Sequence, residues 1–127
     1  MSSSFISGNG WTHFIAAGSE GWEAYTATGS NTSQGVSARI GAYNSNDNSS
    51  VSWLITPEID LNNNTGVTLQ FQTSNSYADD SSLALLFSND WDGTTSGIDA
   101  ATWGIVSRAY ITQNTDAFSN WYDSGLV

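Results

Sequence analysis

Apolar and polar residues alternate along most of this chain with a period of two. The alternation is clearest in residues 67–73, where Val, Leu and Phe occupy every second position. Such a pattern is typical of a strand with one face on a core and the other in water. Residues 83–87 are apolar on both faces and suit a central strand. Strands are predicted at residues 22–26, 36–43, 51–55, 67–73, 83–87, 103–110 and 121–127.

The segments between these runs are rich in residues that form turns. Asn, Asp, Ser and Gly dominate residues 44–50, 62–66, 74–82 and 89–100. Seven short strands at this spacing predict an all-β fold, a jelly-roll-like antiparallel β-sandwich. Only residues 99–103 suit a helical turn. Because neither a linker nor a repeat interrupts the pattern, we expect residues 1–127 to form a single domain.

The same alternation predicts which side chains form the core. Within the expected strands, large apolar residues that recur on one face should be shielded from water. The residues predicted to be buried are Trp53, Leu69, Phe71, Leu85 and Phe87.

Composition narrows the range of partners. Ser, Thr and Asn together make up 46 of the 127 residues, and Lys is absent. Arg39 and Arg108 are the only cationic residues of the sequence beside twelve carboxylates, which gives a net charge of −10. This charge repels polyanions, so nucleic acid and anionic membranes are poor partners. No apolar run approaches the roughly 18 residues that span a membrane, so no membrane insertion is expected. The absence of Cys excludes disulfides and zinc-thiolate sites.

One segment carries a family resemblance. Residues 53–61 read Trp-Leu-Ile-Thr-Pro-Glu-Ile-Asp-Leu, which closely resembles a segment of choice-of-anchor J domains and of related cleaved adhesin domains. Weaker matches follow in the family's order over nearly the whole chain. They are Gly10-Trp11, Gly21-Trp22-Glu23, Leu69-Gln70-Phe71, residues 87–93, Ala101-Thr102-Trp103 and residues 121–125.

The resemblance implies a jelly-roll sandwich related in architecture to carbohydrate-binding modules. Domains of this family are appended to secreted or cell-surface bacterial proteins, often from Bacteroidetes, and their ligands are mostly undefined. An extracellular or cell-surface location is therefore expected. The family pattern continues beyond the strand at residues 121–127. Either the sequence is truncated there, or another copy or subunit completes the sheet.

Aromatic residues in the predicted loops or at their edges are candidate ligand contacts. An exposed ring offers a flat apolar face, and nearby Asn and Asp side chains offer hydrogen bonds, which together suit a sugar. Anchoring of the loops is the competing interpretation, because aromatic side chains bury large areas. The candidate ligand-binding residues are Trp11, Tyr43, Tyr77 and Trp91.

Carboxylates in the same loops are candidate calcium ligands, because Ca²⁺ prefers hard oxygen donors. Asp90 and Asp92 directly follow an expected strand, although a plain hairpin turn that ends in Gly93 explains them equally well. A cation would also relieve the repulsion between two adjacent acidic residues in residues 74–82. The candidate metal ligands are Asp79, Asp80, Asp90, Asp92 and Asp99.

Catalysis is not expected. His13 is the only His, it lies in a segment expected to be irregular, and no nucleophile elbow accompanies it. The favoured hypothesis is a non-catalytic accessory binding or adhesion module with a glycan or cell-surface ligand. The alternative is a structural assembly subunit that pairs with a second copy or a neighbouring domain through an open sheet edge. A hydrolase is the third hypothesis and the least favoured.

Overall fold

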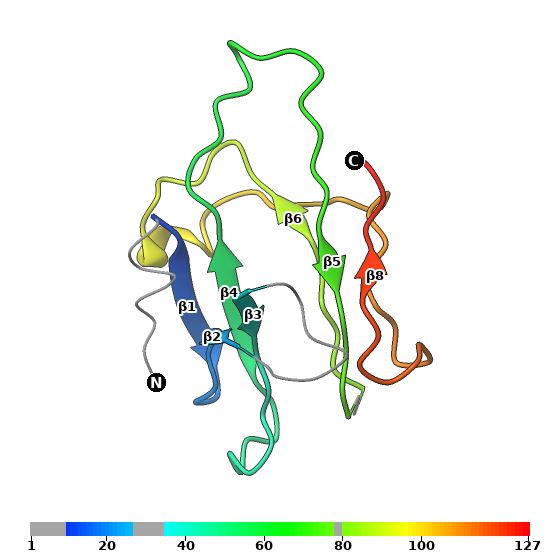
Figure 1. Ribbon diagram of the computed structural model, residues 1–127. Helices are drawn as coiled ribbons and strands as arrows, with labels where there is room; N and C mark the ends of the chain where they lie inside the picture. Colours follow the sequence, from blue (N-terminus) through cyan, green and yellow to red (C-terminus); the bar gives the residue numbers. More distant parts are fainter. Residues whose placement is uncertain (1–9, 27–34, 78–79) are drawn as a thin grey trace. The chain divides into compact units, whose positions relative to one another are not determined.

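The computed structural model describes residues 10–26, 35–77 and 80–127 (Figure 1). The chain divides into two compact units, unit 1 (Met1–Asp60) and unit 2 (Leu61–Val127). The described residues form short antiparallel strand pairs and one three-residue helix, which confirms a mainly-β fold. That helix is far too short to cross a membrane. The expected single domain over residues 1–127 stays a prediction.

The longest ladder lies in unit 1. Strand β1 (Thr12–Ala17) pairs antiparallel with β4 (Val51–Ile55), and the two strands lie side by side in Figure 1. Phe14 lies opposite Trp53, a cross-strand aromatic pair of the kind that stabilises antiparallel sheets. The register shifts between Ile15 and Ala17, where β1 has one residue more than its partner.

A second ladder of unit 1 joins β2 (Glu23–Tyr25) to β3 (Ser37–Arg39). Glu23 lies opposite Arg39, and the two side chains form an ion pair. The Arg39 guanidinium also lies over the ring of Tyr25, 4.1 Å from its centroid. One of the two arginines of the sequence is thus occupied by contacts within this ladder.

In unit 2, β5 (Gln72–Thr73) pairs antiparallel with β8 (Tyr122–Asp123). Backbone hydrogen bonds extend the pairing, because the Leu69 N–H donates to Val127 O at 2.7 Å and the Val127 N–H donates to Leu69 O at 3.1 Å. Between these pairs the segment of β8 contains one residue more than the segment of β5. Gly125, at φ 71°, lies at this extra position, in the left-handed region that favours glycine.

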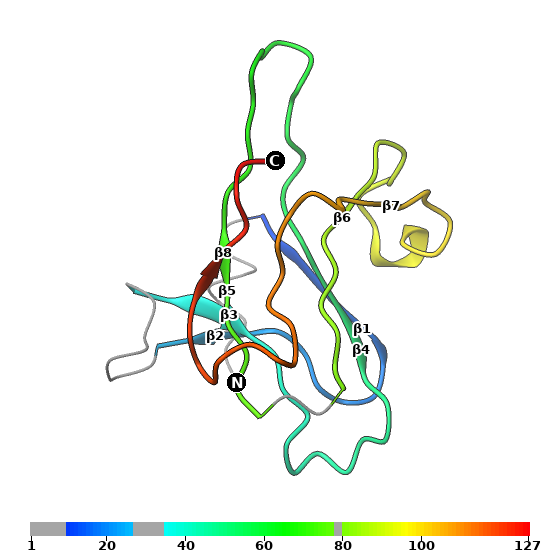
Figure 2. The ribbon, with the colours of Figure 1, turned by 90° about the vertical axis from the view of Figure 1, so that its right-hand side faces the viewer.

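The other ladder of unit 2 joins β6 (Leu86–Phe87) to β7 (Gly104–Ile105). Phe87 lies opposite Gly104, and a Cβ at Gly104 would lie 2.6 Å from the Phe87 ring. Only glycine therefore allows the ring to lie across the partner strand. The 3₁₀ helix η1 (Thr95–Gly97) belongs to the excursion between the two strands, drawn in yellow in Figure 2.

The strands agree with the predicted positions but are mostly shorter. Strand β4 coincides with the predicted segment 51–55, whereas β1 was missed because its residues were expected to be irregular. The helical turn predicted at residues 99–103 begins earlier, at η1. A side chain decides this position, because the Thr94 hydroxyl accepts a hydrogen bond from the Gly97 N–H and starts the turn.

Burial differs most from the expectation. Among the described residues, Ile98 is the only fully buried apolar side chain, at 1% exposure, and Ser124 the only buried polar one. Leu69 and Phe87 were predicted to be buried, which is wrong, since they are 44% and 59% exposed. Alternation predicts which residues share a face of a strand, but not whether another layer covers that face. The other predicted core residues are half-buried: Trp53, Phe71 and Leu85.

Candidate functional site

Two loops of unit 2 are joined side by side by their own polar side chains. The Asn75 amide donates to Gln113 O at 2.6 Å, and the Ser119 N–H donates to Asn75 O at 2.8 Å. The hydroxyls of Ser76 and Ser119 are 2.5 Å apart. These bonds connect residues about forty positions apart in the sequence, so the loop after β5 and the loop before β8 form one structural element.

A pair of threonines secures the inner end of this element. The hydroxyls of Thr73 and Thr112 are 2.7 Å apart, and the Thr112 N–H donates to the Thr73 hydroxyl at 3.0 Å. Both residues are half-buried. The hydroxyl of Thr73, at the end of β5, thus takes the place of a ladder hydrogen bond to the second loop.

The second loop is shaped by a carboxylate. Asp116 accepts hydrogen bonds from the Gln113 N–H at 2.7 Å and from the Tyr110 hydroxyl at 2.6 Å. The hydrogen bond to Asp116 raises the pKa of Tyr110, because it stabilises the protonated phenol. The ring of Tyr110 also lies 6.0 Å from that of Tyr122 on β8. Both backbone polar groups of Gln113 are therefore hydrogen-bonded, the N–H to Asp116 and the carbonyl oxygen to the Asn75 amide.

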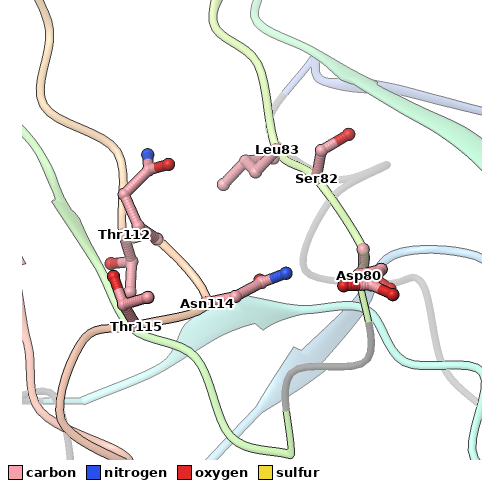
Figure 3. Close-up of a pocket in the computed structure, with 8 residues that line it drawn as sticks. Asp80, Ser82, Leu83, Thr112, Asn114 and Thr115 are labelled. Carbon is pink, nitrogen blue, oxygen red and sulfur yellow. The ribbon is translucent and has the colours of Figure 1, made fainter.

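A cleft of about 310 Å³ opens between the two loops (Figure 3). In Figure 3, Leu83 points into the opening toward Thr112, and Asn114 extends toward Asp80 from the opposite side. Hydroxyl and amide groups dominate the described part of the lining, in which there is one carboxylate and no cationic side chain. The lining residues are Asp80, Ser81, Ser82, Leu83, Thr112, Gln113, Asn114 and Thr115.

An exposed aromatic pair lies on the same two loops. The rings of Tyr77 and Phe118 meet edge to face, with centroids 5.0 Å apart and planes at 77°. Their side chains remain 87% and 56% exposed. Tyr77 was among the predicted ligand contacts, and its partner Phe118 was not. Two large rings thus point into solvent from a pair of loops that hydrogen bonds hold together.

The backbone of these loops is strained. Tyr77, Asp80 and Ser119 have φ values of 56°, 68° and 56°, a left-handed conformation that non-glycine residues rarely adopt. The other non-glycine residues with positive φ in the described segments are Asn44 and Asn46. Asn and Asp, Asp80 included, tolerate this conformation better than Tyr or Ser. Strained residues persist only where the surrounding structure fixes them, and they cluster at ligand sites.

Asp90, predicted as a metal ligand, organises its own loop. Its Oδ1 accepts hydrogen bonds from the Ser88 hydroxyl at 2.7 Å and from the Thr102 N–H at 2.8 Å. These two donors, the Ser88 hydroxyl first, lower the pKa of Asp90 because they stabilise the charged form. The carboxylate thereby joins the two ends of the excursion between β6 and β7.

Asp92 and Trp91 support the start of η1. The Asp92 Oδ1 accepts from the Thr94 hydroxyl at 2.7 Å and from the Thr94 N–H at 2.8 Å, and these bonds lower the pKa of Asp92. The Trp91 indole N–H donates to Thr94 O at 2.8 Å. Its ring lies 6.3 Å from that of Trp103. For Trp91 these contacts favour loop anchoring over sugar contact.

The predicted calcium ligands do not form one cluster in the part of the chain that the structure describes. No three Asp, Glu, His or Cys side chains gather there as a metal-binding group. Asp80 lines the cleft, Asp99 is exposed in the turn after η1, and Asp79 lies outside the described residues. Calcium binding therefore stays a prediction.

The remaining predicted ligand contacts belong to unit 1. Trp11 is half-buried at the residue before β1. Tyr43 is 92% exposed and lies in a turn closed by the hydrogen bond from the Ser45 N–H to Ala42 O. Trp11 and Tyr43 thus lie in different loops of unit 1. Among the ring contacts of the described residues, none involves either of them.

His13 lies on β1 rather than in an irregular segment. Its Nε2 accepts a hydrogen bond from the Trp22 N–H at 3.1 Å. A Cβ at Gly21 would overlap the imidazole, so glycine is required there. The surrounding hollow, about 390 Å³, also contains Glu20 and Glu23. The Nε2 lone pair is thus used by the backbone, which is a structural role.

Sequence reasoning missed most of the cleft. Its lining between Thr112 and Thr115 reads as an ordinary polar turn, and Phe118 stands alone among small residues. The only sequence pattern that marks this turn is its lack of alternation. Comparison of the chain with protein-family models, with curated proteins and with solved structures gave no match.

Proposed function

We propose that this chain is a non-catalytic binding module of a secreted or cell-surface bacterial protein, and that the cleft of unit 2 binds carbohydrate. The proposal includes the jelly-roll sandwich and the kinship with choice-of-anchor J domains. It is supported by the resemblance at residues 53–61 and by the mainly-β fold.

The observation that carries the proposal is the pairing of an exposed aromatic surface with a polar cleft on the same two loops. A pyranose ring has an apolar C–H face and a rim of hydroxyls. Tyr77 and Phe118 offer a surface for the first. Asn114 and Gln113 offer amide donors and acceptors for the second.

Charge supports the choice of ligand class. The described lining of the cleft contains no cationic residue that could pair with a phosphate or a carboxylate. A ligand rich in neutral hydroxyls needs no cationic partner. It exchanges its hydrogen bonds with water for hydrogen bonds with the lining. Because the cleft is open, much of the ligand stays hydrated, and we expect a Kd on the order of 0.1 mM.

The test is binding of neutral oligosaccharides by the purified chain. Cellohexaose, mannohexaose, galactohexaose and chitohexaose are titrated by calorimetry, followed by the variants Tyr77→Ala and Phe118→Ala. For the sugar that binds, each variant should weaken affinity by about tenfold, the value of one aromatic contact.

Tyr43→Ala is the matched control, since Tyr43 is equally exposed but lies in unit 1. It should leave affinity unchanged. The proposal would be contradicted if none of the four sugars bound. Equal affinity of the Tyr77→Ala variant and the parent chain would contradict it too.

A second candidate is pairing through a sheet edge, favoured by exposed apolar residues around the β5–β8 ladder. Val67, Leu69 and Leu126 are 51%, 44% and 66% exposed. One edge of the β8 segment is already paired with the β5 segment. On the other side, Ser124 O already accepts a hydrogen bond from the Tyr110 N–H at 3.0 Å, so a strand from a second copy would have to pair with the rest of that edge. Self-repulsion opposes such association, so sedimentation should detect dimers that increase with salt, and a monomer at every salt concentration would argue against this candidate.

A further inference from the structure

We infer that the cleft of unit 2 discriminates against glycans that carry carboxylate or sulfate groups, and that Asp80 is the residue that sets this selectivity. The inference rests on the proposed carbohydrate function and adds the class of glycan.

Among the lining residues that the structure describes, Asp80 is the only charged one. Asn114, which extends toward it from the other loop, is neutral (Figure 3). A carboxylate only accepts hydrogen bonds when it is ionised, so it can receive a sugar hydroxyl or amine but can give nothing to an anionic group. An acidic sugar in the cleft would meet one like charge and no opposite charge.

The surroundings of the cleft have the same sign. Unit 2 contains seven Asp residues and a single cation, Arg108. The lining and the unit around it therefore repel an anion together. At separations of about 5 Å in a largely aqueous site, this repulsion weakens the binding of a singly charged ligand about fivefold to tenfold at low salt.

The experiment uses sugars that differ only in charge. For each neutral hexaose that binds, the counterpart has a single primary alcohol oxidised to a carboxylate, so that it carries one negative charge. Both are titrated into the full chain at about 20 mM and 300 mM salt, where screening differs strongly. The oxidised sugar should bind at least five times more weakly at low salt, and the ratio should shrink at high salt.

Asp80→Asn should reduce that ratio to about twofold. Asp99→Asn is the matched control: it changes the charge of unit 2 equally, and Asp99 is exposed but does not line the cleft. It should leave the ratio near the parent value. Asp80→Gly is a second variant, because glycine accepts the φ of 68° at this position and so preserves the loop if the amide does not.

The outcomes separate the two proposals. Binding of no neutral hexaose defeats the carbohydrate function itself. Equal affinity for a neutral hexaose and its oxidised counterpart at low salt overturns the selectivity and leaves the function standing. Equal effects of Asp80→Asn and Asp99→Asn overturn the assignment to Asp80. The assignment to Asp80 is supported if the ratio of neutral to oxidised affinity falls in Asp80→Asn or Asp80→Gly and stays at the parent value in Asp99→Asn.

Discussion

The two units of this chain are organised by different interactions. In unit 1, the β1–β4 ladder runs over five paired positions. In unit 2, β5–β8 and β6–β7 pair over two positions each, and side-chain hydrogen bonds to the backbone connect the segments. Where ladders are short, Ser, Thr, Asn and Asp take over their role, and the loops they fix can present aromatic rings to solvent.

Unit 1 uses the same type of carboxylate contact, but for a smaller purpose. The Asp47 Oδ2 accepts hydrogen bonds from the Ser19 N–H at 2.7 Å and from the Ser50 hydroxyl at 2.9 Å. These bonds, the Ser19 amide first, lower the pKa of Asp47. They tie the turn after β1 to the loop before β4, at the end of a ladder that already has its own hydrogen bonds. In unit 2 the equivalent bonds connect segments whose ladders are only two pairs long.

The largest expected effect follows from the single buried apolar side chain of the described residues. Ile98→Ala should destabilise unit 2 by about 2–4 kcal/mol, because it removes a completely enclosed side chain and leaves a cavity. Chemical denaturation measures the loss. Ile59→Ala is the control, since Ile59 is 61% exposed and belongs to unit 1. A loss below 1 kcal/mol for Ile98→Ala would mean that the Ile98 side chain contributes little to the stability of unit 2.

The next effect tests unit 1. Gly21→Ala should cost about 1–2 kcal/mol, since the new methyl overlaps the His13 imidazole and forces it off the Trp22 N–H. The double variant with His13→Ala should recover part of this loss, which a double-mutant cycle in thermal unfolding would show. If the two losses simply add, the imidazole does not limit the size of residue 21.

Acid should act more strongly on unit 2 than on unit 1. The pKa values of Asp90 and Asp92 in unit 2 and of Asp47 in unit 1 are lowered by hydrogen bonds. A carboxylate with a lowered pKa contributes its full stability above its unfolded pKa of about 3.9 and loses it as the pH falls through the folded pKa. Melting between pH 6 and pH 2 should therefore show a decline in Tm below about pH 4.

Asparagine variants assign this decline to the two units. Asp90→Asn and Asp92→Asn should each make the Tm less dependent on pH in acid. Asp47→Asn should reduce the acid dependence of amide protection in unit 1 more than in unit 2. Hydrogen exchange followed residue by residue distinguishes the units. An unchanged slope in all three variants would show that other carboxylates cause the acid sensitivity.

The smallest expected effect is that of calcium. The Oδ1 atoms of Asp90 and Asp92 each already accept two hydrogen bonds from the protein, so we expect only weak binding to the acidic loops. At a concentration near the Kd, Ca²⁺ should raise the Tm by about 2 °C relative to a chelator. An identical Tm in the two buffers would contradict calcium binding by these loops.

Local structure could be predicted from the sequence. Alternation gave the position of β4 and the mainly-β class, and the clusters of Asn, Ser and Gly gave the turns, because both depend on neighbours a few residues apart. It also placed Tyr43 and Tyr77 at the edges of loops, and both are exposed. Pattern alone predicted β5 to β8 as longer strands than they are, since it carries no information about partners.

Only the tertiary structure decided burial and the site. Ile98 is enclosed although its neighbours are polar, while Phe87 on a regular strand is exposed, since enclosure depends on which segments pack around a residue. The cleft exists because Thr73 bonds to Thr112, 39 positions away, and Asn75 to Gln113, 38 positions away. A local pattern cannot specify such a pairing, because many Ser, Thr and Asn residues have the same donors and acceptors, and only the path of the backbone selects which of them meet.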